Sequence, residues 1–270
     1  MGRPLIGRYF LWPGRLLYVG RGGRSALHQH HLIQLGVSLG RAVQIRTAPD
    51  ASYCQYESFL IGADAPHQLV AVGRQPKVFI WIDPESQHGR CLQELAGASR
   101  IQPLSNQLPK KTKWVETIAE HLTRTERVMT CTDADALCDA LLETIIPKKG
   151  PPLTIDERVE KACALIEASV PGATPTAQDL AEAVFLSPSR LMHLFSEQMG
   201  LPMRRYALWQ RMTVALRHMA RGQPLTYAAL EAGFSDAPHF SRTFRQMFGT
   251  PPSTLFKNSR FIQATSCYGA

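Results

Sequence analysis

The sequence predicts two domains of different classes. We expect a mostly β N-terminal domain, a small barrel or sandwich followed by helices, and an all-α C-terminal domain with two helix-turn-helix motifs joined by a long helix. Short β-prone segments separated by turn residues fill residues 1–85. In the other half, residues 176–202 recur as residues 225–251. Between the halves, the run PKKGPP at 147–152 stops both patterns and predicts a linker.

Six β-prone segments define the expected β domain. Glycines and other turn residues separate them, as at Gly40 and at Pro49-Asp50. Several short strands at this spacing are typical of a sandwich or barrel. The segments are residues 16–19, 32–39, 42–46, 58–61, 68–72 and 78–82.

Helical patterns replace the strands after Pro84, and we expect helices over residues 85–98, 110–124 and 133–146. Two of these helices carry an apolar stripe at helical spacing. Each stripe has two interpretations, which are packing against the β domain and a dimer surface. The stripes are Trp114, Ile118 and Leu122 in one helix and Leu137, Leu141 and Ile145 in the other.

The first copy of the repeat predicts a short helix, a turn and a second helix. Thr176 is the expected N-cap of the first helix, and Ser187 is that of the second, where Pro188 takes the first helical position. Gly200 ends the second helix. Its apolar residues recur at helical spacing and mark a buried face. The opposite face is therefore outward and carries Ser189, Arg190, Met192, His193 and Ser196.

The second copy repeats this design. We expect a helix over residues 226–232, a turn at Gly233 and Phe234, and a second helix capped by Ser235 or Asp236. Its predicted outward positions are Ala237, Pro238, His239, Ser241, Arg242 and Arg245. Six positions are identical at the 49-residue offset, namely Glu182 and Glu231, Ala183 and Ala232, Phe185 and Phe234, Phe195 and Phe244, Gly200 and Gly249, and Pro202 and Pro251.

A long segment without glycine or proline, residues 203–221, joins the two copies. As a straight helix it would span about 28 Å at ~1.5 Å per residue. Successive major grooves on one side of B-DNA lie about 34 Å apart. A rigid helix of this length can therefore hold two recognition helices at a spacing close to one turn of DNA.

These motifs resemble those of the AraC/XylS family of bacterial transcription regulators. The second copy carries AGFSD at 232–236, HFSR at 239–242 and PP at 251–252, and the first carries LSPSRL at 186–191. The resemblance covers residues 154–260. Members of the family commonly have glutamine and serine where this chain has Ala237 and Pro238. Because neither of these side chains donates a hydrogen bond, we expect the second motif to contact mostly phosphates.

The resemblance implies a sequence-specific, DNA-binding transcription regulator that is an activator rather than a repressor and no enzyme. It implies domain boundaries of 1–146 for a cupin-like effector-sensing and dimerisation domain of the jelly-roll type, 147–153 for the linker, 154–260 for the DNA-binding domain and 261–270 for a tail. The implied partners are promoter DNA, RNA polymerase, a small-molecule effector and a second copy of the chain. Two alternatives stay open, a cupin-type metal-dependent enzyme fused to a DNA-binding module and a regulator controlled by a protein partner.

Three histidines are the expected effector-binding residues of the β domain. His28 and His30 lie on the same side of an extended segment, because side chains alternate along a strand, and His67 belongs to another segment. The arrangement also resembles the metal-binding pattern of catalytic cupins, but Gln34 stands where those proteins have a glutamate. Packing, a polar ligand and a metal ion are all open interpretations of these histidines, and the sequence assigns no metal or cofactor to them.

The composition fits a globular protein with an anionic partner. The net charge is +8 and the pI is about 9.4, which favours nucleic acid. The excess of positive charge is not concentrated in the C-terminal half. Residues 151–270 carry 12 basic and 9 acidic residues, and residues 1–150 carry 18 basic and 13 acidic residues. Charge alone therefore would not have located the DNA-binding part.

The cysteines and the hydropathy indicate a cytoplasmic protein. Six cysteines are scattered without the spacing of a zinc site, so we expect reduced thiols, with a redox-sensing pair as the alternative. The sequence contains no apolar run of membrane length, and we expect no signal peptide. A membrane partner is therefore not expected.

Overall fold

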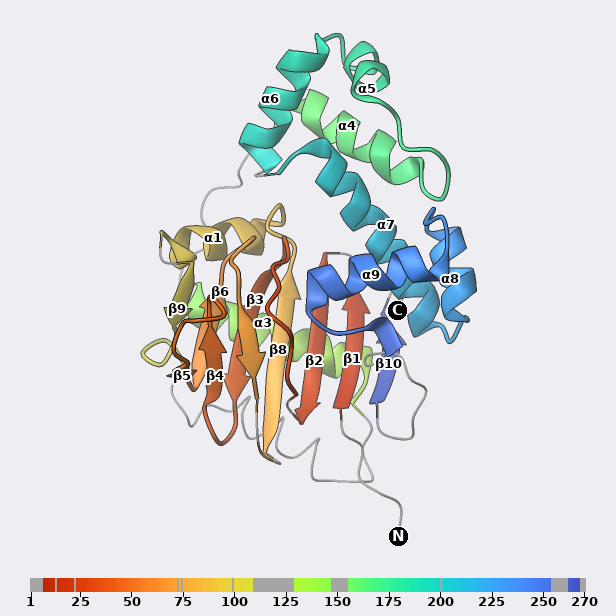
Figure 1. Ribbon diagram of the computed structural model, residues 1–270. Helices are drawn as coiled ribbons and strands as arrows, with labels where there is room; N and C mark the ends of the chain where they lie inside the picture. Colours follow the sequence, from red (N-terminus) through yellow and green to blue (C-terminus); the bar gives the residue numbers. More distant parts are fainter. Residues whose placement is uncertain are drawn as a thin grey trace. The chain divides into compact units, whose positions relative to one another are not determined.

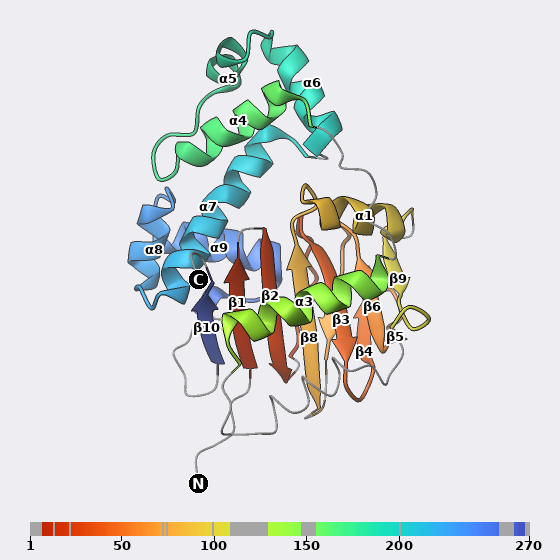
Figure 2. The ribbon, with the colours of Figure 1, turned by 180° about the vertical axis from the view of Figure 1, so that it is seen from behind.

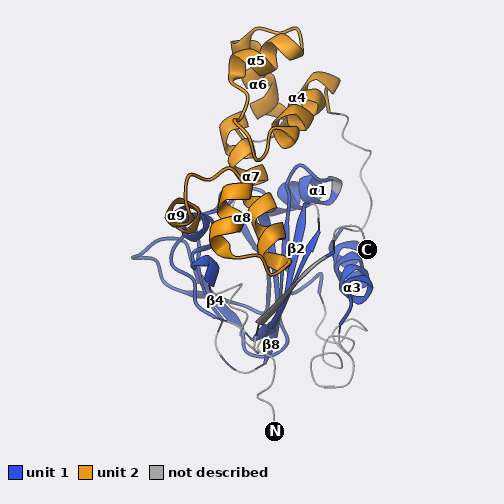
Figure 3. Ribbon diagram, turned by 90° about the vertical axis from the view of Figure 1, so that its right-hand side faces the viewer, with its two compact units in different colours: residues 1–150, 243–270 blue, residues 151–242 orange. Residues whose placement is uncertain are grey.

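The computed structural model divides the chain into two compact units (Figure 3). Unit 1 comprises residues 1–150 together with residues 243–270, and unit 2 comprises residues 151–242. The structure describes residues 7–12, 14–21, 23–71, 73, 75–98, 100–108, 129–146, 155–199, 201–253 and 262–267, with only the backbone of Gln87 and of 262–266. The predicted helix at 110–124, its stripe of Trp114, Ile118 and Leu122, and the predicted linker at 147–153 lie outside these residues.

Unit 1 is built on two open sheets (Figure 1). The larger sheet has the order β10-β1-β2-β8-β3-β6-β9, and the smaller has the order β5-β4-β7. All described pairings are antiparallel except that of β10 with β1. The strands are β1 (Gly7–Trp12), β2 (Arg15–Arg21), β3 (Ile33–Ser38), β4 (Val43–Arg46), β5 (Cys54–Tyr56), β6 (Ser58–Ile61), β7 (Gln68–Val70), β8 (Pro76–Ile82), β9 (Ile101–Pro103) and β10 (Ile262–Ser266).

The central strands of the larger sheet are buried on both faces. β2 is buried along five consecutive residues and β8 along four, and consecutive side chains of a strand point to opposite faces. One of these faces is covered by α3 (Cys131–Ile145), which lies across the sheet in Figure 2. A capping box at Thr130 and Asp133 starts this helix.

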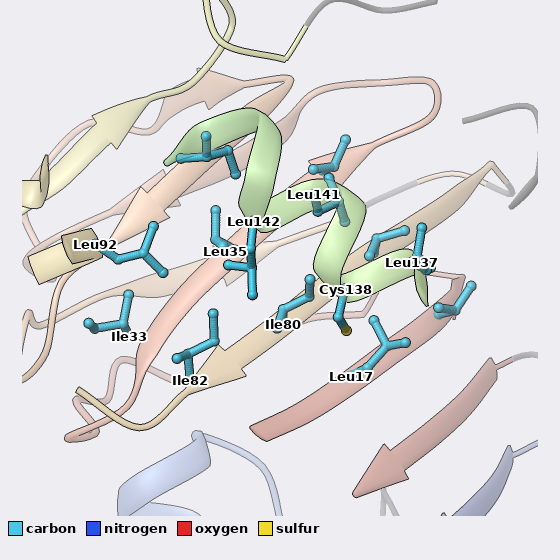
Figure 4. Packing of buried hydrophobic residues seen from close by; sticks show 14 of the residues in the cluster. Leu17, Ile33, Leu35, Ile80, Ile82, Leu92, Leu137, Cys138, Leu141 and Leu142 are labelled. Atoms are coloured by element: carbon cyan, nitrogen blue, oxygen red, sulfur yellow. The ribbon is translucent and has the colours of Figure 1, made fainter. Parts of the chain in front are cut away.

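Helix α3 packs its apolar stripe onto the sheet. Leu137, Leu141 and Leu142 join Leu17 and Ile80 in one buried cluster (Figure 4). Each such leucine contributes about 1.5–3 kcal/mol by leaving water. The stripe predicted at Leu137, Leu141 and Ile145 therefore packs within unit 1, which is the first of its two interpretations. Unit 1 also contains α1 (Gln87–Ala96), which begins at the N-cap Ser86.

The predicted combination of a sheet-rich N-terminal part and a helical C-terminal part is confirmed. The structure adds strands that the sequence pattern did not indicate, namely β1, β5, β9 and β10. β10 lies in the segment expected to be only a tail, and it pairs in parallel with β1. The jelly-roll barrel of the cupin type stays a prediction, because the described strands form two open sheets.

The expectation that all six cysteines are reduced thiols is not met in the structure. Cys131 and Cys267 form a disulfide across 136 residues of sequence. Strand β10 brings Cys267 to the start of α3, and the Cys267 N–H donates to the Leu11 carbonyl at 2.8 Å. The sequence separation hid this pair, since nothing in the tail indicated a strand.

Unit 2 is helical. Its helices are α4 (Glu157–Ala168), α5 (Ala177–Ala183), α6 (Pro188–Met199), α7 (Met203–Ala220), α8 (Leu225–Glu231) and the first half of α9 (Ala237–Phe248), whose second half belongs to unit 1. Helices α4, α5 and α6 and the start of α7 share one apolar core that includes Ile166, Leu191, Phe195 and Tyr206. None of the helices in the described parts of the chain is long and apolar enough to cross a membrane.

Candidate nucleic-acid interface and histidine cluster

The first helix pair, α5 and α6, begins each helix as the sequence predicted. Thr176 Oγ1 accepts from the Asp179 N–H at 3.2 Å, and the Asp179 carboxylate accepts from the Thr176 N–H at 2.8 Å. Ser187 Oγ accepts from the Arg190 N–H at 3.3 Å. Each contact satisfies an N–H that has no partner inside its own helix. The turn between the helices contains Phe185, which has a left-handed backbone with φ of 56° and a side chain that is 91% exposed.

Helix α6 has the outward face that the sequence predicted. Its apolar residues Leu191, Leu194, Phe195 and Met199 are buried. The five residues proposed to meet DNA are all exposed, namely Ser189, Arg190, Met192, His193 and Ser196. Their exposure leaves polar and basic groups near the start of the helix free to reach base edges and phosphates. Contact with DNA itself stays a prediction for each of them.

The second helix pair, α8 and α9, is capped by one of the two predicted residues. Asp236 Oδ1 accepts from the His239 N–H at 2.5 Å, whereas the Ser235 hydroxyl contacts the His239 ring at 3.1 Å. Asp236 is therefore the cap. Gly233 makes the turn with φ of 76°, and Phe234 is buried against Phe240, with ring centroids 5.2 Å apart.

The predicted outward residues of α9 are less uniformly exposed than those of α6. Pro238, Arg242 and Arg245 are exposed. The side chains of Ala237, His239 and Ser241 are partly buried. Of the six predicted residues, those that project freely are thus two arginines, with their guanidinium groups, and one proline. Guanidinium groups suit phosphate contacts, which fits the expectation for the second motif.

Helix α7 joins the two pairs as a single element of 18 residues. At ~1.5 Å per residue its length is about 27 Å. The Tyr206 hydroxyl donates to the Glu167 carboxylate of α4 at 2.7 Å, and the Arg211 guanidinium donates to the Thr174 hydroxyl at 2.9 Å. These side chains fix the start and middle of α7 against the rest of unit 2.

The three predicted histidines do come together in unit 1, and we call them the histidine cluster: His28, His30 and His67. His28 and His67 form an antiparallel bridge, in which each N–H donates to the other's carbonyl at 3.0 and 2.8 Å. Side chains of such a directly opposed pair lie on the same face, and His30 shares that face two residues further along. The ring centroids of His28 and His67 are 4.2 Å apart, and those of His30 and His67 are 5.0 Å apart.

The Nδ1 atom of every ring in the cluster faces a backbone carbonyl. His28 contacts the Ala26 carbonyl at 2.9 Å, His30 contacts that of Leu32 at 2.7 Å, and His67 contacts that of Ala65 at 2.8 Å. The Nε2 atom of His30 lies 3.2 Å from Oε1 of Gln34. The Nε2 atom of His67 is buried and has no hydrogen-bond partner among the described residues.

The cluster is held in its neutral form. Burial, followed by the charge of His28, lowers the pKa of His30 to about 4, and burial also lowers the pKa of His67 and of His28. His31 is the opposite case, because its side chain contacts Asp64 and Glu85 at 3.1 and 2.7 Å. Burial alone would lower its pKa, but hydrogen bonds and charge from these two carboxylates raise the pKa of His31 to about 9.

Two features of these sites could not be read from the sequence. The carbonyls that orient the cluster come from Ala26, Leu32 and Ala65, which carry no chemical signal of their own. The second feature is the left-handed, exposed Phe185, because phenylalanine rarely adopts positive φ and its sequence neighbours give no sign of it.

A family model described as a helix-turn-helix domain matches residues 180–258. The arabinose operon regulatory protein of Escherichia coli strain K12 is 34% identical over 113 residues, which are 42% of this chain and 38% of that protein. The transcriptional activator RhrA of Rhizobium meliloti strain 1021 is 35% identical over 80 residues, which are 28% of this chain and 25% of that protein. The chain therefore spans well under half the length of these relatives in its matches.

Solved structures resemble this chain over most of its length, beyond the C-terminal part that the sequence relatives match. An apo variant of ToxT from Vibrio cholerae matches with a TM-score of 0.56 at 13% identity, covering 90% of this chain and 97% of ToxT. Another solved form of ToxT is described as bound to an unsaturated fatty acid and matches with a TM-score of 0.54. At such low identity the likeness concerns the fold, which comprises a sheet-rich part and a helical part.

Proposed function

We propose that the chain is a sequence-specific DNA-binding activator of the AraC/XylS type that is controlled at its N-terminal unit. Support comes from the helix-turn-helix family model and from the regulators that match the C-terminal part of the chain. The observation that carries this proposal is the exposed face of α6, in which Arg190 and His193 project from a capped helix whose other side is buried. A recognition helix needs such a face, because its side chains must reach base edges in the major groove.

In this proposal the two helix pairs have different tasks. The first pair reads bases through α6, and the second pair holds the phosphate backbone through Arg242 and Arg245 of α9. Helix α7 sets the distance between them, since its length of about 27 Å is close to one turn of B-DNA. The assignment of activation follows the relative RhrA, which is named a transcriptional activator, and RNA polymerase is the partner that activation requires.

The control site in this proposal is the histidine cluster. Two of its rings, His30 and His67, are buried, and Nε2 of His67 has no hydrogen-bond partner in the part of the chain that the structure describes. A buried polar group without a partner costs free energy in the folded protein. A ligand that supplies the missing partner would recover this cost, and it would act as an effector if it favoured one state of the chain over another.

A homodimer is also part of the proposal. Dimerisation would place two copies of the DNA-binding part on one promoter and increase the overall affinity through avidity. Sedimentation of the full chain at micromolar concentrations tests this point, and a monomer at all concentrations would contradict it.

Selection of duplexes from a random DNA library by the full chain tests the DNA-binding function. We expect a consensus sequence that the chain prefers over random DNA by a factor of at least ~10³ at physiological salt. Replacement of Arg190 by alanine should relax the preference at one base pair. Selection rounds that yield no enriched sequence, with folded protein, would contradict the proposal.

A further inference from the structure

The histidine cluster is the one group of three metal-ligating side chains found among the described residues. One ring nitrogen from each of His28, His30 and His67 lies within 4.8 Å of those of the other two. We propose that this cluster binds a divalent late first-row metal ion, of the class of Zn²⁺ and Ni²⁺, with the side-chain oxygen of Gln34 as the fourth ligand.

The backbone prepares the three rings as ligands. A carbonyl oxygen can only accept, so the Nδ1 atom that faces it must carry the proton in each ring. In a neutral imidazole the other nitrogen, Nε2, then presents a lone pair. Metal-binding histidines typically have this second hydrogen bond, which fixes the tautomer and the ring orientation. The contact occurs three times in the cluster, at carbonyls from three different places in the chain.

The contact between His30 and Gln34 brings two acceptor atoms together, so it is favourable only if a cation lies between them. His30 Nε2 and Gln34 Oε1 lie 3.2 Å apart, and both are acceptors once Nδ1 of His30 holds the proton. Two ligands at ~2.0–2.2 Å from a tetrahedral Zn²⁺ ion lie about 3.4 Å from each other. An ion between the two atoms therefore converts a repulsive contact into two bonds, and it also supplies a partner for the buried Nε2 of His67.

The ligand set points to a class of ion and to reversible binding. Imidazole nitrogen suits Zn²⁺, Ni²⁺ and Cu²⁺, whereas Mg²⁺ and Ca²⁺ prefer sites made of oxygen. All four ligands are neutral, and the nearby carboxylates of Asp64 and Glu85 contact His31, whose side chain alternates to the other face. The bound ion would keep its positive charge, so we expect weaker and more exchangeable binding than in a site with thiolates or carboxylates.

The site is linked to the end of α9 within unit 1. The Ala26 carbonyl accepts from His28, and the Ala26 N–H donates to the carbonyl of Gly249 at 2.9 Å. Gly249 directly follows α9, and a Cβ atom there would lie 2.5 Å from Nδ1 of His28. A metal ion that draws the His28 ring inward would therefore act on the last turn of α9. The regulatory meaning of this link rests on the proposed function, whereas the metal site does not.

Calorimetric titration of the untagged full chain, stripped with a chelator and dialysed, tests the site with Zn²⁺, Ni²⁺ and, for comparison, Mg²⁺. We expect one Zn²⁺ or Ni²⁺ ion per chain and no binding of Mg²⁺. His28→Ala and His67→Ala should weaken binding by at least ~10-fold, since even loss of an orienting partner costs that much. His88→Ala is the matched control, because this half-exposed histidine lies on α1 outside the cluster, and it should bind as the unchanged chain does.

Gln34→Glu is the sharpest variant, because it should strengthen binding. A carboxylate would add an anionic ligand where a neutral one stands, so we expect at least ~10-fold tighter binding and a metal-dependent rise in melting temperature. If the Gln34 amide instead donates to His30 and the cluster is only packing, neither the unchanged chain nor Gln34→Glu will bind metal, and the proposal is overturned. Equal binding by His67→Ala and the unchanged chain would also overturn it.

A second readout separates the metal site from the function proposed above. Affinity for selected DNA, measured with and without Zn²⁺ or Ni²⁺, should change at least ~5-fold if the ion is an effector, the lower range of allosteric coupling. The change should vanish in His67→Ala. Metal binding with unchanged DNA affinity would overturn the role as effector, whereas absence of selective DNA binding under all conditions would overturn the proposed function and leave the metal site standing.

Discussion

The two helix pairs share a sequence pattern but differ in the turn between their helices. Helices α6 and α9 both have 12 residues, and α5 and α8 both have 7. The second helices start 49 residues apart, at Pro188 and Ala237, whereas the first helices start only 48 apart, at Ala177 and Leu225. The turn of the second pair is therefore one residue longer.

The additional turn residue is accompanied by a difference in burial between two phenylalanines at equivalent positions of the repeat. Phe185 and Phe234 occupy the same position of the repeat, yet Phe185 is 91% exposed and Phe234 is 3% exposed. In the second pair Gly233 takes the left-handed conformation and lets Phe234 turn inward, while in the first pair Phe185 itself is left-handed. Identical residues in the two copies therefore preserve the helices but not the role of each residue. The first pair is left with an exposed apolar ring in the turn before α6.

Replacing each phenylalanine by alanine is the most severe test of this difference. Phe234→Ala should lower the free energy of unfolding of unit 2 by about 3–5 kcal/mol, the cost of deleting a buried ring. Phe185→Ala should change it by less than ~0.5 kcal/mol, as for an ordinary surface position. Urea unfolding followed by far-ultraviolet circular dichroism measures both. Similar losses in the two variants would show that the turns are alike.

The glycine of the second turn gives the next largest effect. Gly233→Ala places a Cβ 2.8 Å from the Pro171 carbonyl in addition to its positive φ. We expect a loss of about 2–4 kcal/mol, combining ~1–2 kcal/mol for the left-handed residue with a steric term. Gly222→Ala is the matched control, because it has the same backbone conformation with φ of 79° but open space around it. Its loss should be limited to the first contribution, and equal losses would rule out the clash.

The outward face of α6 is expected to carry base recognition. Arg190→Ala or His193→Ala should weaken binding to the selected site by about 1–3 kcal/mol and relax the preference at one position. Arg41→Ala removes the same charge from an exposed position of unit 1 and should leave the preference unchanged. Unaltered affinity and selectivity in both α6 variants would remove this helix from base reading.

The second pair is expected to bind phosphates. Loss of one phosphate contact should have the smallest effect of the four substitutions. Arg242→Ala should weaken binding to selected and random DNA alike, and it should reduce the slope of log affinity against log salt by about 1. Filter binding or fluorescence anisotropy over a series of salt concentrations measures this slope. A loss confined to the selected site would indicate that Arg242 reads a base.

The helical part of the chain could be predicted closely because its signals are local. Thr176 and Ser187 mark helix starts through contacts that span only three residues, and the apolar spacing of α6 identifies its buried face. The burial of Phe234 beside the exposure of Phe185 could not be predicted, since it depends on one added turn residue that the aligned repeat hides.

The sheets were predicted less completely because strand pairing is not local. β10 pairs with β1 from the other end of the chain, and neither strand has an alternating pattern that stands out. In the histidine cluster, alternation predicted that His28 and His30 share a face. The pairing of His28 with His67 depends on the register between two segments, and a shift of one residue would turn His67 to the other side.

Hydroxyl-radical footprinting of the full chain on its selected DNA tests most directly whether both helix pairs bind. Two pairs held by a rigid α7 should protect two patches on one side of the duplex, about 10 base pairs apart. Arg190→Ala should weaken protection of one patch more than the other. A single protected patch, unchanged in extent by substitutions in α9, would contradict the account that both helix pairs occupy neighbouring major grooves.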